Sequence, residues 1–133
     1  MLQDFISVNR LNAKIQPYRA KTGMVKCELF VADGKTVCAV FYSRQKLNAA
    51  KIMAATMASE LRAVGEKEAE EITGYSAKFM PPVSVYGVLA LVDKRAAHAE
   101  KLCCIVGEEK TLEISGAEIL SANEESLAAD IAD

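Results

Sequence analysis

Two runs with a period of two residues dominate the first third of the chain. The runs Met24–Ala32 and Lys35–Tyr42 are rich in β-branched and aromatic residues and are separated by Asp33-Gly34. An Asp-Gly pair in this position predicts a two-residue hairpin, because a type I′ turn needs positive φ at both central residues. The short turn also sets the register of the two strands, so each side chain has a predicted partner across the hairpin.

Alternation along the hairpin divides its side chains between two faces. One face is apolar and is expected to join the core: Val25, Cys27, Leu29, Val31, Cys38, Val40 and Tyr42. The other face is mostly apolar but carries Glu28 and also Lys26, which is expected opposite Phe41. Lys26 has two interpretations. In the first, its methylenes lie on Phe41 and its ammonium reaches water. In the second, it borders a cleft and provides a fixed positive charge for an anionic ligand.

The remaining pattern predicts short elements around this hairpin. Strands are expected at residues 11–18, 60–64, 88–92, 102–106 and 111–114. Helices are expected at residues 1–9, 49–58, 66–72, 116–120 and 124–131, with caps at Asn48, Gly74 and Ser115. Together they predict one domain, residues 1–133, of mixed α/β (α+β) class, in which a strongly twisted mixed sheet or half-barrel has helices packed outside it.

Residues 73–87 form the least regular stretch. It contains Tyr75, Lys78 and Phe79, and then two adjacent prolines, the second of which is Pro82. Adjacent prolines exclude a helix interior or a central strand. A long loop in a small domain is either a binding site or a rigid surface connection, and the pattern is compatible with both.

Composition narrows the function classes. The chain has 133 residues, of which 51% are hydrophobic and 26% charged, which is typical of a globular protein. No apolar run is long enough to span a bilayer, and no targeting segment is recognised at the N-terminus, so a cytoplasmic protein is expected. The four cysteines lack CxxC spacing and are expected to be reduced. With a single histidine, His98, the sequence predicts no metal site, no cofactor and no Ser-His or Cys-His nucleophile.

The net charge of −2 does not indicate a nucleic-acid binder by bulk electrostatics. Basic residues are nevertheless concentrated in the first fifth of the chain: Arg10, Lys14, Arg19, Lys21 and Lys26. They form either a local basic surface for phosphates or an ordinary solvated face, and the second interpretation is favoured for these residues taken alone.

In the order and spacing of its elements the chain resembles the YbaK/ProX family of aminoacyl-tRNA editing domains, which deacylate mischarged tRNA. Val25-Lys26-Cys27 stands where the family carries Lys-Thr, and Thr73-Gly74-Tyr75 with Pro82 resembles the active-site loop. Val92-Asp93 resembles the strand end that follows, and residues 111–120 the final strand–helix corner.

This resemblance implies roles for individual residues. Lys26 would be the catalytic lysine that orients the acylated end of the tRNA. The loop 78–82 would position the ester or a ribose hydroxyl, and water, activated by the substrate's own ribose hydroxyl, would attack. The substrate-binding residues would be Cys27, Tyr75, Lys78, Phe79, Pro82 and Asp93. The implied partners are the tRNA acceptor end and, as an option, an aminoacyl-tRNA synthetase, with no membrane involved.

The chain also departs from the family. Lys78 and Phe79 replace two glycines at the start of the loop, and bulky side chains there are expected to narrow the pocket, with Phe79 near its mouth. Ile105 replaces a small hydroxyl residue, and the short link 19–23 replaces a helix. A deacylase is therefore only slightly favoured over a non-catalytic tRNA- or nucleotide-binding module. A partner-binding or self-associating domain is the third alternative.

Overall fold

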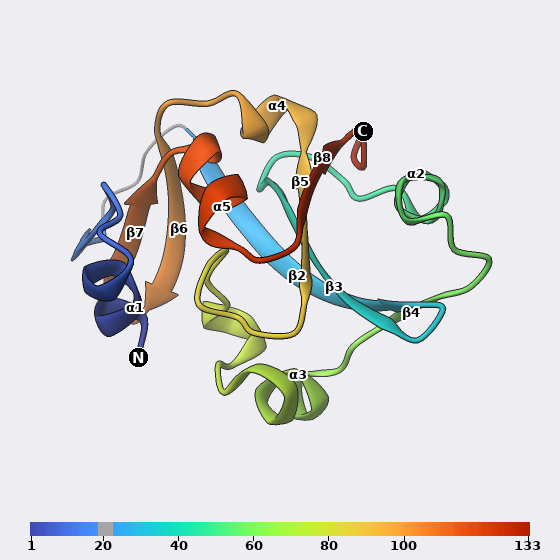
Figure 1. Ribbon diagram of the computed structural model, residues 1–133, viewed down its shortest axis with the longest axis horizontal. Coiled ribbons are helices and arrows are strands. Elements are labelled where there is room, and N and C mark those ends of the chain that lie inside the picture. The colour runs from blue at the N-terminus through green and yellow to red at the C-terminus, as the bar shows by residue number, and fades with distance from the viewer. Residues whose placement is uncertain (19–22) are drawn as a thin grey trace.

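In the computed structural model, which describes residues 1–18 and 23–133, eight strands form one sheet. Its order is β1-β7-β6-β2-β3-β5-β8, and β4 pairs with β2 outside this path. The sheet curls strongly into a half-barrel with helices outside it, as expected (Figure 1). The strands are β1 Lys14–Pro17, β2 Met24–Ala32, β3 Lys35–Tyr42, β4 Leu61–Ala63, β5 Leu89–Asp93, β6 Leu102–Gly107, β7 Lys110–Ile114 and β8 Ser126–Ala129.

The hairpin β2–β3 has the predicted turn and register. Asp33 and Gly34 have φ values of 48° and 83°, the left-handed conformation that a type I′ turn requires. Lys26 lies opposite Phe41, and Ala32 lies opposite Lys35. The hairpin is the centre of the sheet, since β3 continues to β5 in parallel and β2 continues to β6 in parallel.

The two faces of the hairpin belong to two different apolar clusters. Leu29 and Val40 belong to the larger cluster, which also contains Cys104 of β6. Val37 and Ala39 point to the opposite side of the sheet and pack in a smaller cluster with Ile52. Alternation therefore predicted the faces correctly, although Val31 is only half-buried.

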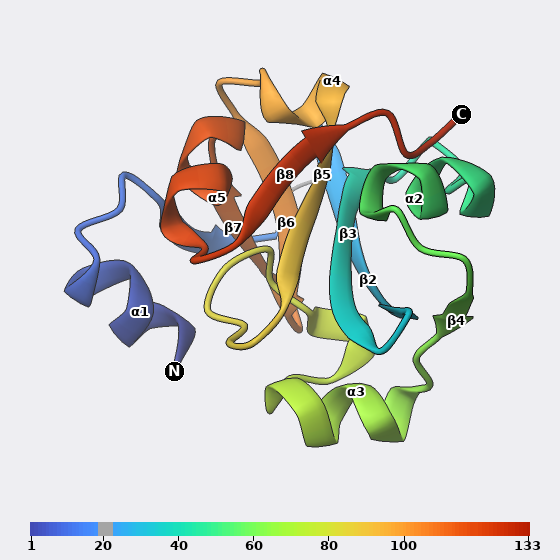
Figure 2. The same cartoon turned by 45° about the vertical axis from the view of Figure 1, so that its right-hand side comes forward.

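Helices cover the sheet on several sides (Figure 2). They are α1 Leu2–Val8, α2 Ala49–Thr56, α3 Glu66–Thr73, α4 Lys94–Ala97 and α5 Gly116–Ala122, with a 3₁₀ turn η1 at Ala77–Phe79. Asn48 and Ser115 cap α2 and α5 as predicted, because their side-chain oxygens accept from the backbone N–H of Lys51 and Glu118. Gly74 ends α3 at φ 79°.

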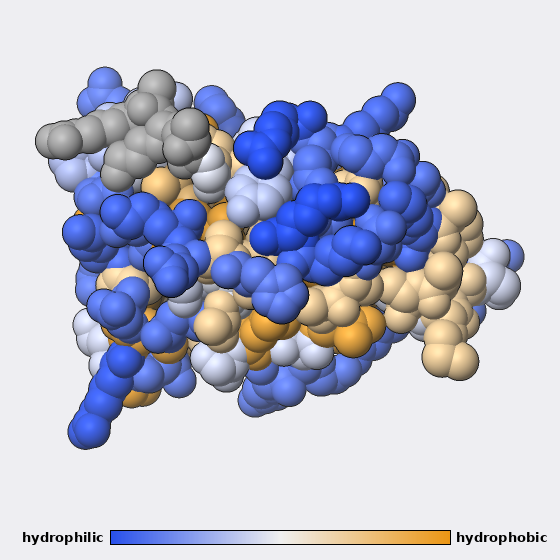
Figure 3. All heavy atoms as spheres, turned by 90° about the horizontal axis from the view of Figure 1, so that it is seen from above, coloured by the Kyte–Doolittle hydropathy of each residue, from blue (hydrophilic) through white to orange (hydrophobic). Residues whose placement is uncertain are grey.

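Polar residues cover much of the face seen in Figure 3, and apolar atoms gather toward the side on which Figure 1 places α2. That helix carries several alanines and is followed by Met57, which is fully exposed. In the described part of the chain, the helices are all too short or too polar to cross a bilayer.

The prediction of a helix at residues 124–131 is wrong. Residues Ser126–Ala129 form strand β8, which pairs in parallel with β5. Ile131, just beyond it, is fully buried in the smaller cluster. The run Leu-Ala-Ala favours a helix locally, but pairing with the exposed edge of β5 satisfies the backbone and buries Ile131, and this tertiary gain exceeds the small difference in propensity.

Residues 74–87, after the end of α3 at Thr73, lack regular structure apart from η1, as predicted, but the middle of this loop does not lie on the surface. Residues 80–85 are all buried. The hydroxyl of Tyr75 is 2.8 Å from Oγ of Ser84, which has φ 70°. The middle of the loop is therefore held inside the fold.

Candidate functional site

One edge of β2 has no strand beside its middle residues. The pairing with β6 ends at Val25, and the pairing with β4 begins at Phe30. The turn η1 packs beside β2 and β6 at this place. Between the two pairings the sheet is therefore open, and Lys26 and Glu28 lie in that interval.

Two adjoining hollows occupy the opening. Their volumes are about 230 and about 330 Å³, and they share the lining residues Cys27, Glu28, Ala77, Lys78 and Met80. The first hollow is lined in addition by Met24, Val25, Lys26, Ser43, Cys104 and Ile105. The second extends along β2 toward α3, where its further lining residues are Leu29, Phe30, Ala63, Val64, Glu66 and Ala69. Together they form a groove, which we call the β2 groove.

Lys26 lines the β2 groove with an exposed side chain. Within residues 1–18 and 23–133 its ammonium has no hydrogen bond or salt bridge, and Glu28 is not within ion-pair distance of it. Lys26 thus carries a positive charge that no described side chain neutralises, as an anion contact requires.

Cys27 is the buried neighbour of Lys26 on the opposite face of β2. Hydrogen bonding with the side chains of Cys104 and Cys38, together with burial, holds the pKa of the Cys27 thiol well above its usual value. A thiol of this kind stays protonated at neutral pH and is a poor nucleophile. Cys27 therefore contributes an uncharged wall to the groove.

Lys78 and Phe79, which were expected to replace two glycines, have different positions relative to the groove. Lys78 lines both hollows and is exposed. Phe79 lines neither of them, so the expectation that Phe79 stands at the pocket mouth is not met. Its ring lies 5.3 Å from Nζ of Lys78, within cation–π range. The departure therefore adds a second lysine to the groove rather than an aromatic lid.

Tyr75 and Pro82 are held away from the β2 groove, in the packing of the loop. Burial raises the pKa of the Tyr75 phenol, whose hydroxyl is bonded to Ser84. Pro82 is buried, and its carbonyl accepts a hydrogen bond of 3.0 Å from Nδ2 of Asn123. Both residues shape the loop from within, and neither lines the groove.

Asp93 is also outside the groove and is fully buried. Its carboxylate accepts from the backbone N–H groups of Arg95 and Ile131, at 3.1 and 3.3 Å, and from the Arg95 guanidinium at 3.2 Å. It caps α4 and ties the C-terminal segment to β5. This bonding explains Asp93 as a structural residue and leaves its predicted contact with substrate without support.

The lining residues Glu28 and Cys104 were not among the predicted site residues. Glu28 was noted on the same strand face as Lys26, which was the available signal. Met80 lies within the predicted loop 78–82, whereas Cys104 had no such signal, because only the fold brings β6 and the loop beside β2. Lys21, by contrast, lies outside the described residues.

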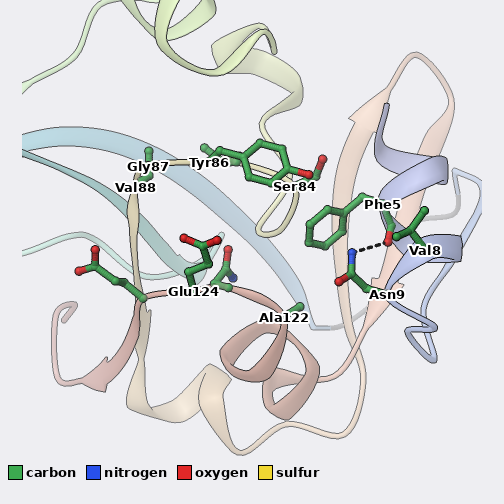
Figure 4. Close-up of a pocket in the computed structure, with 12 residues that line it drawn as sticks. Phe5, Val8, Asn9, Ser84, Tyr86, Gly87, Val88, Ala122 and Glu124 are labelled. Carbon is green, nitrogen blue, oxygen red and sulfur yellow. Dashed lines mark hydrogen bonds between the residues drawn. The ribbon is translucent and has the colours of Figure 1, made fainter.

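A further cavity of about 310 Å³ lies between α1, the loop and the end of α5 (Figure 4). Phe5 points into it from α1, at 6.1 Å and 68° to the ring of Tyr86. Glu124 lines the opposite side. Lys26 and Lys78 are not part of this cavity, and none of its lining residues in the described part of the chain is basic.

Comparison with known proteins identifies the fold to which the groove belongs. Residues 11–122 match the family described as the aminoacyl-tRNA editing domain. The chain belongs to this family. The match includes both β2 and the loop 73–87, so the β2 groove lies within the editing domain. A search of curated proteins found no match.

Solved structures share the same fold. The crystal structure of hypothetical protein APE2540 is 20% identical, with a TM-score of 0.85 and 99% of each chain covered. A proposed trans-editing enzyme for prolyl tRNA synthetase is 17% identical, with a TM-score of 0.86 over 99% of this chain and 94% of that one. A proposed signal transduction protein from Marinobacter aquaeolei VT8 is 15% identical, with a TM-score of 0.76, and this chain covers 30% of its length.

Proposed function

We propose that the protein is an aminoacyl-tRNA deacylase that acts in trans, hydrolysing the ester between a mischarged amino acid and its tRNA. The family supports aminoacyl-tRNA editing as the general activity. The observation that carries the assignment is Lys26 in the β2 groove, which has no partner among the described residues and lies beside the loop that holds Lys78. Two lysines in a groove suit the phosphates of a tRNA acceptor end.

Water is the proposed nucleophile. The pKa of Cys27 is raised, so its thiol is not an activated nucleophile. His98 follows α4 and lines neither hollow. The chain's contribution is then to hold the ester and the substrate's own ribose hydroxyl in a reactive orientation, with Lys26 and the loop 78–82 fixing the position. Such a substrate is found in the cytoplasm, and a synthetase that produces it is the natural partner.

A non-catalytic tRNA- or nucleotide-binding module is the second candidate. Lys78 stands where the family has a glycine, and a bulky residue there hinders close approach of the loop backbone to a ligand. This module would keep the two lysines as phosphate contacts and lose ester hydrolysis.

The decisive experiment measures deacylation of a panel of mischarged tRNAs by the wild type and by Lys26→Ala. The variant is expected to be roughly 10²-fold slower, which is about 2.7 kcal/mol and reasonable for one charge-assisted contact at the reacting centre. Lys110→Ala, an exposed lysine outside the groove, is the matched control and is expected to keep the wild-type rate.

Circular dichroism and thermal melting of each variant accompany the assay, because a substitution within a strand can also change the stability of the fold. Equal rates for Lys26→Ala and the wild type would refute the role of Lys26. If no tRNA is deacylated but the wild type binds acceptor-stem RNA, the binding-module alternative is correct.

A further inference from the structure

Glu28 is a second charged residue without a partner in the β2 groove. It lines both hollows and its side chain is exposed. In the described part of the chain its carboxylate has no hydrogen bond and no salt bridge. Among the described residues that line the first hollow, it is the sole carboxylate, whereas Lys26 and Lys78 are the two cations.

The arrangement of these charges is set by the strand. Lys26 and Glu28 are two residues apart on β2, so they project from the same side at a spacing of roughly 6.7 Å along the strand. They do not neutralise each other by an ion pair. The groove therefore presents a positive group and a negative group side by side, and a ligand with the opposite pair of charges fits it best.

The 3′ end of an aminoacyl-tRNA carries such a pair. Its phosphates are anionic, and the α-amino group of the esterified amino acid is protonated and a few bonds away from the ester. A carboxylate binds an ammonium by charge-assisted hydrogen bonds. The Glu28 carboxylate would also repel a phosphate. The phosphate is therefore expected beside Lys26 and the ammonium beside Glu28.

We propose that Glu28 binds the α-ammonium of the aminoacyl group and is the residue through which the groove selects esters with a free amino group. N-blocked esters, such as N-acetylaminoacyl or peptidyl esters, lack this cation and are selected against. The proposal rests on the proposed function, because it names a specificity-determining residue of the same groove. Glu28 is here a specificity-determining residue and has no part in bond cleavage.

A stable analogue separates binding from hydrolysis. The probe is 3′-deoxy-3′-(alanylamino)adenosine 5′-monophosphate, whose amide is not an ester, and the second probe is its N-acetyl derivative. The affinities of both for the wild type, Glu28→Gln and Glu108→Gln are measured by calorimetry. Glu108 is an exposed residue of the β6–β7 turn outside the groove, so its variant has the same change in net charge.

The wild type is expected to bind the free-amine probe roughly two- to fivefold more tightly than the N-acetyl probe, as one charge-assisted contact at an exposed site provides. Glu28→Gln should lose this preference, and Glu108→Gln should keep it. Equal affinities of the wild type for the two probes, or binding of neither, would overturn the role of Glu28.

Hydrolysis is assayed separately, with alanyl-tRNA and N-acetylalanyl-tRNA among the esters. If the wild type hydrolyses both at the same rate, the inference about Glu28 fails while the deacylase function stands. If the probes are discriminated but no ester is hydrolysed, the deacylase function fails while the assignment of Glu28 stands.

Discussion

At the scale of single residues, neighbours on one strand have opposite surroundings. Lys26 and Glu28 are exposed, and Cys27 between them is buried. The pleat separates them, so the charges of the groove come from one face of β2 and its thiol from the other. A substitution in this strand consequently acts on the groove or on the core, depending on which face of the strand its side chain occupies.

The close contact between helices α4 and α5 depends on a single residue, Gly116. A Cβ at this position would lie 2.3 Å from the carbonyl oxygen of Ala96 and 2.5 Å from that of Ala97. Gly116→Ala is therefore expected to lower the free energy of unfolding by about 1–3 kcal/mol, the usual cost of overpacking, measured by urea denaturation. Gly107→Ala is the control, since its nearest contact would be the flexible side chain of Lys110 at 3.5 Å. Equal losses in the two variants would contradict this account.

At the scale of elements, the C-terminal segment shows how position in the fold overrides local preference. Strand β8 lies at the edge of the sheet beside β5. The segment after it returns to Leu47, which forms a bridge with Ala132. The fully buried Asp93 joins β5, α4 and this segment. Pairing and capping therefore act together to hold the C-terminus against the sheet.

Two residues of this segment make the arrangement testable. Ile131 is completely buried, whereas Leu127 is 40% exposed. Ile131→Ala is expected to lower the free energy of unfolding by about 2–5 kcal/mol, as for other large-to-small core substitutions. Leu127→Ala should cost clearly less. A C-terminus that did not pack on the sheet would give similar, small losses for both variants in chemical denaturation.

At the scale of the whole molecule, the curled sheet and the buried loop bring distant segments to one groove. Strand β2, the turn η1 and strand β6 all line it, although they are far apart in sequence.

The surface of the molecule is stabilised in addition by carboxylates with lowered pKa values: Asp33, Glu68, Asp130 and Asp133. Hydrogen bonds from the backbone N–H groups of Ser59 and Glu60 lower the pKa of Asp33. A hydrogen bond from Arg62 lowers the pKa of Glu68. Hydrogen bonding to Lys51 is the largest cause of the lowered pKa values of Asp130 and Asp133.

These carboxylates predict a loss of stability in acid. A folded pKa below the unfolded one stabilises the fold fully at pH values above the unfolded pKa, about 4, and this contribution disappears as the pH falls through the folded pKa. The urea midpoint is therefore expected to be lower at pH 3 than at pH 7. Asp33→Asn should lower the midpoint at pH 7 and make it less dependent on pH in this range. An unchanged pH dependence in this variant would contradict the role of Asp33.

Much of the fold follows from local pattern. The Asp-Gly turn and the alternation beside it determined the hairpin, its register and its two faces, because a two-residue turn permits a single register. The caps Asn48, Gly74 and Ser115 were readable because each depends on residues within one turn of a helix. Of the residues that line the β2 groove, Lys26, Cys27 and Lys78 follow from the resemblance in order and spacing to the editing family.

Other features were decided by contacts between segments far apart in the chain. The segment at residues 124–131 became a strand because β5 offered an unpaired edge, and Asp93 became a structural residue because Arg95 and Ile131 surround its carboxylate. Phe79 and Tyr75 stay outside the β2 groove because the loop is held inward by buried residues that the pattern did not place. The sequence by itself determined which side chains share a strand face. Only the tertiary structure decided where β2 lacks a neighbour, and this opening is what makes Lys26 and Glu28 parts of a groove.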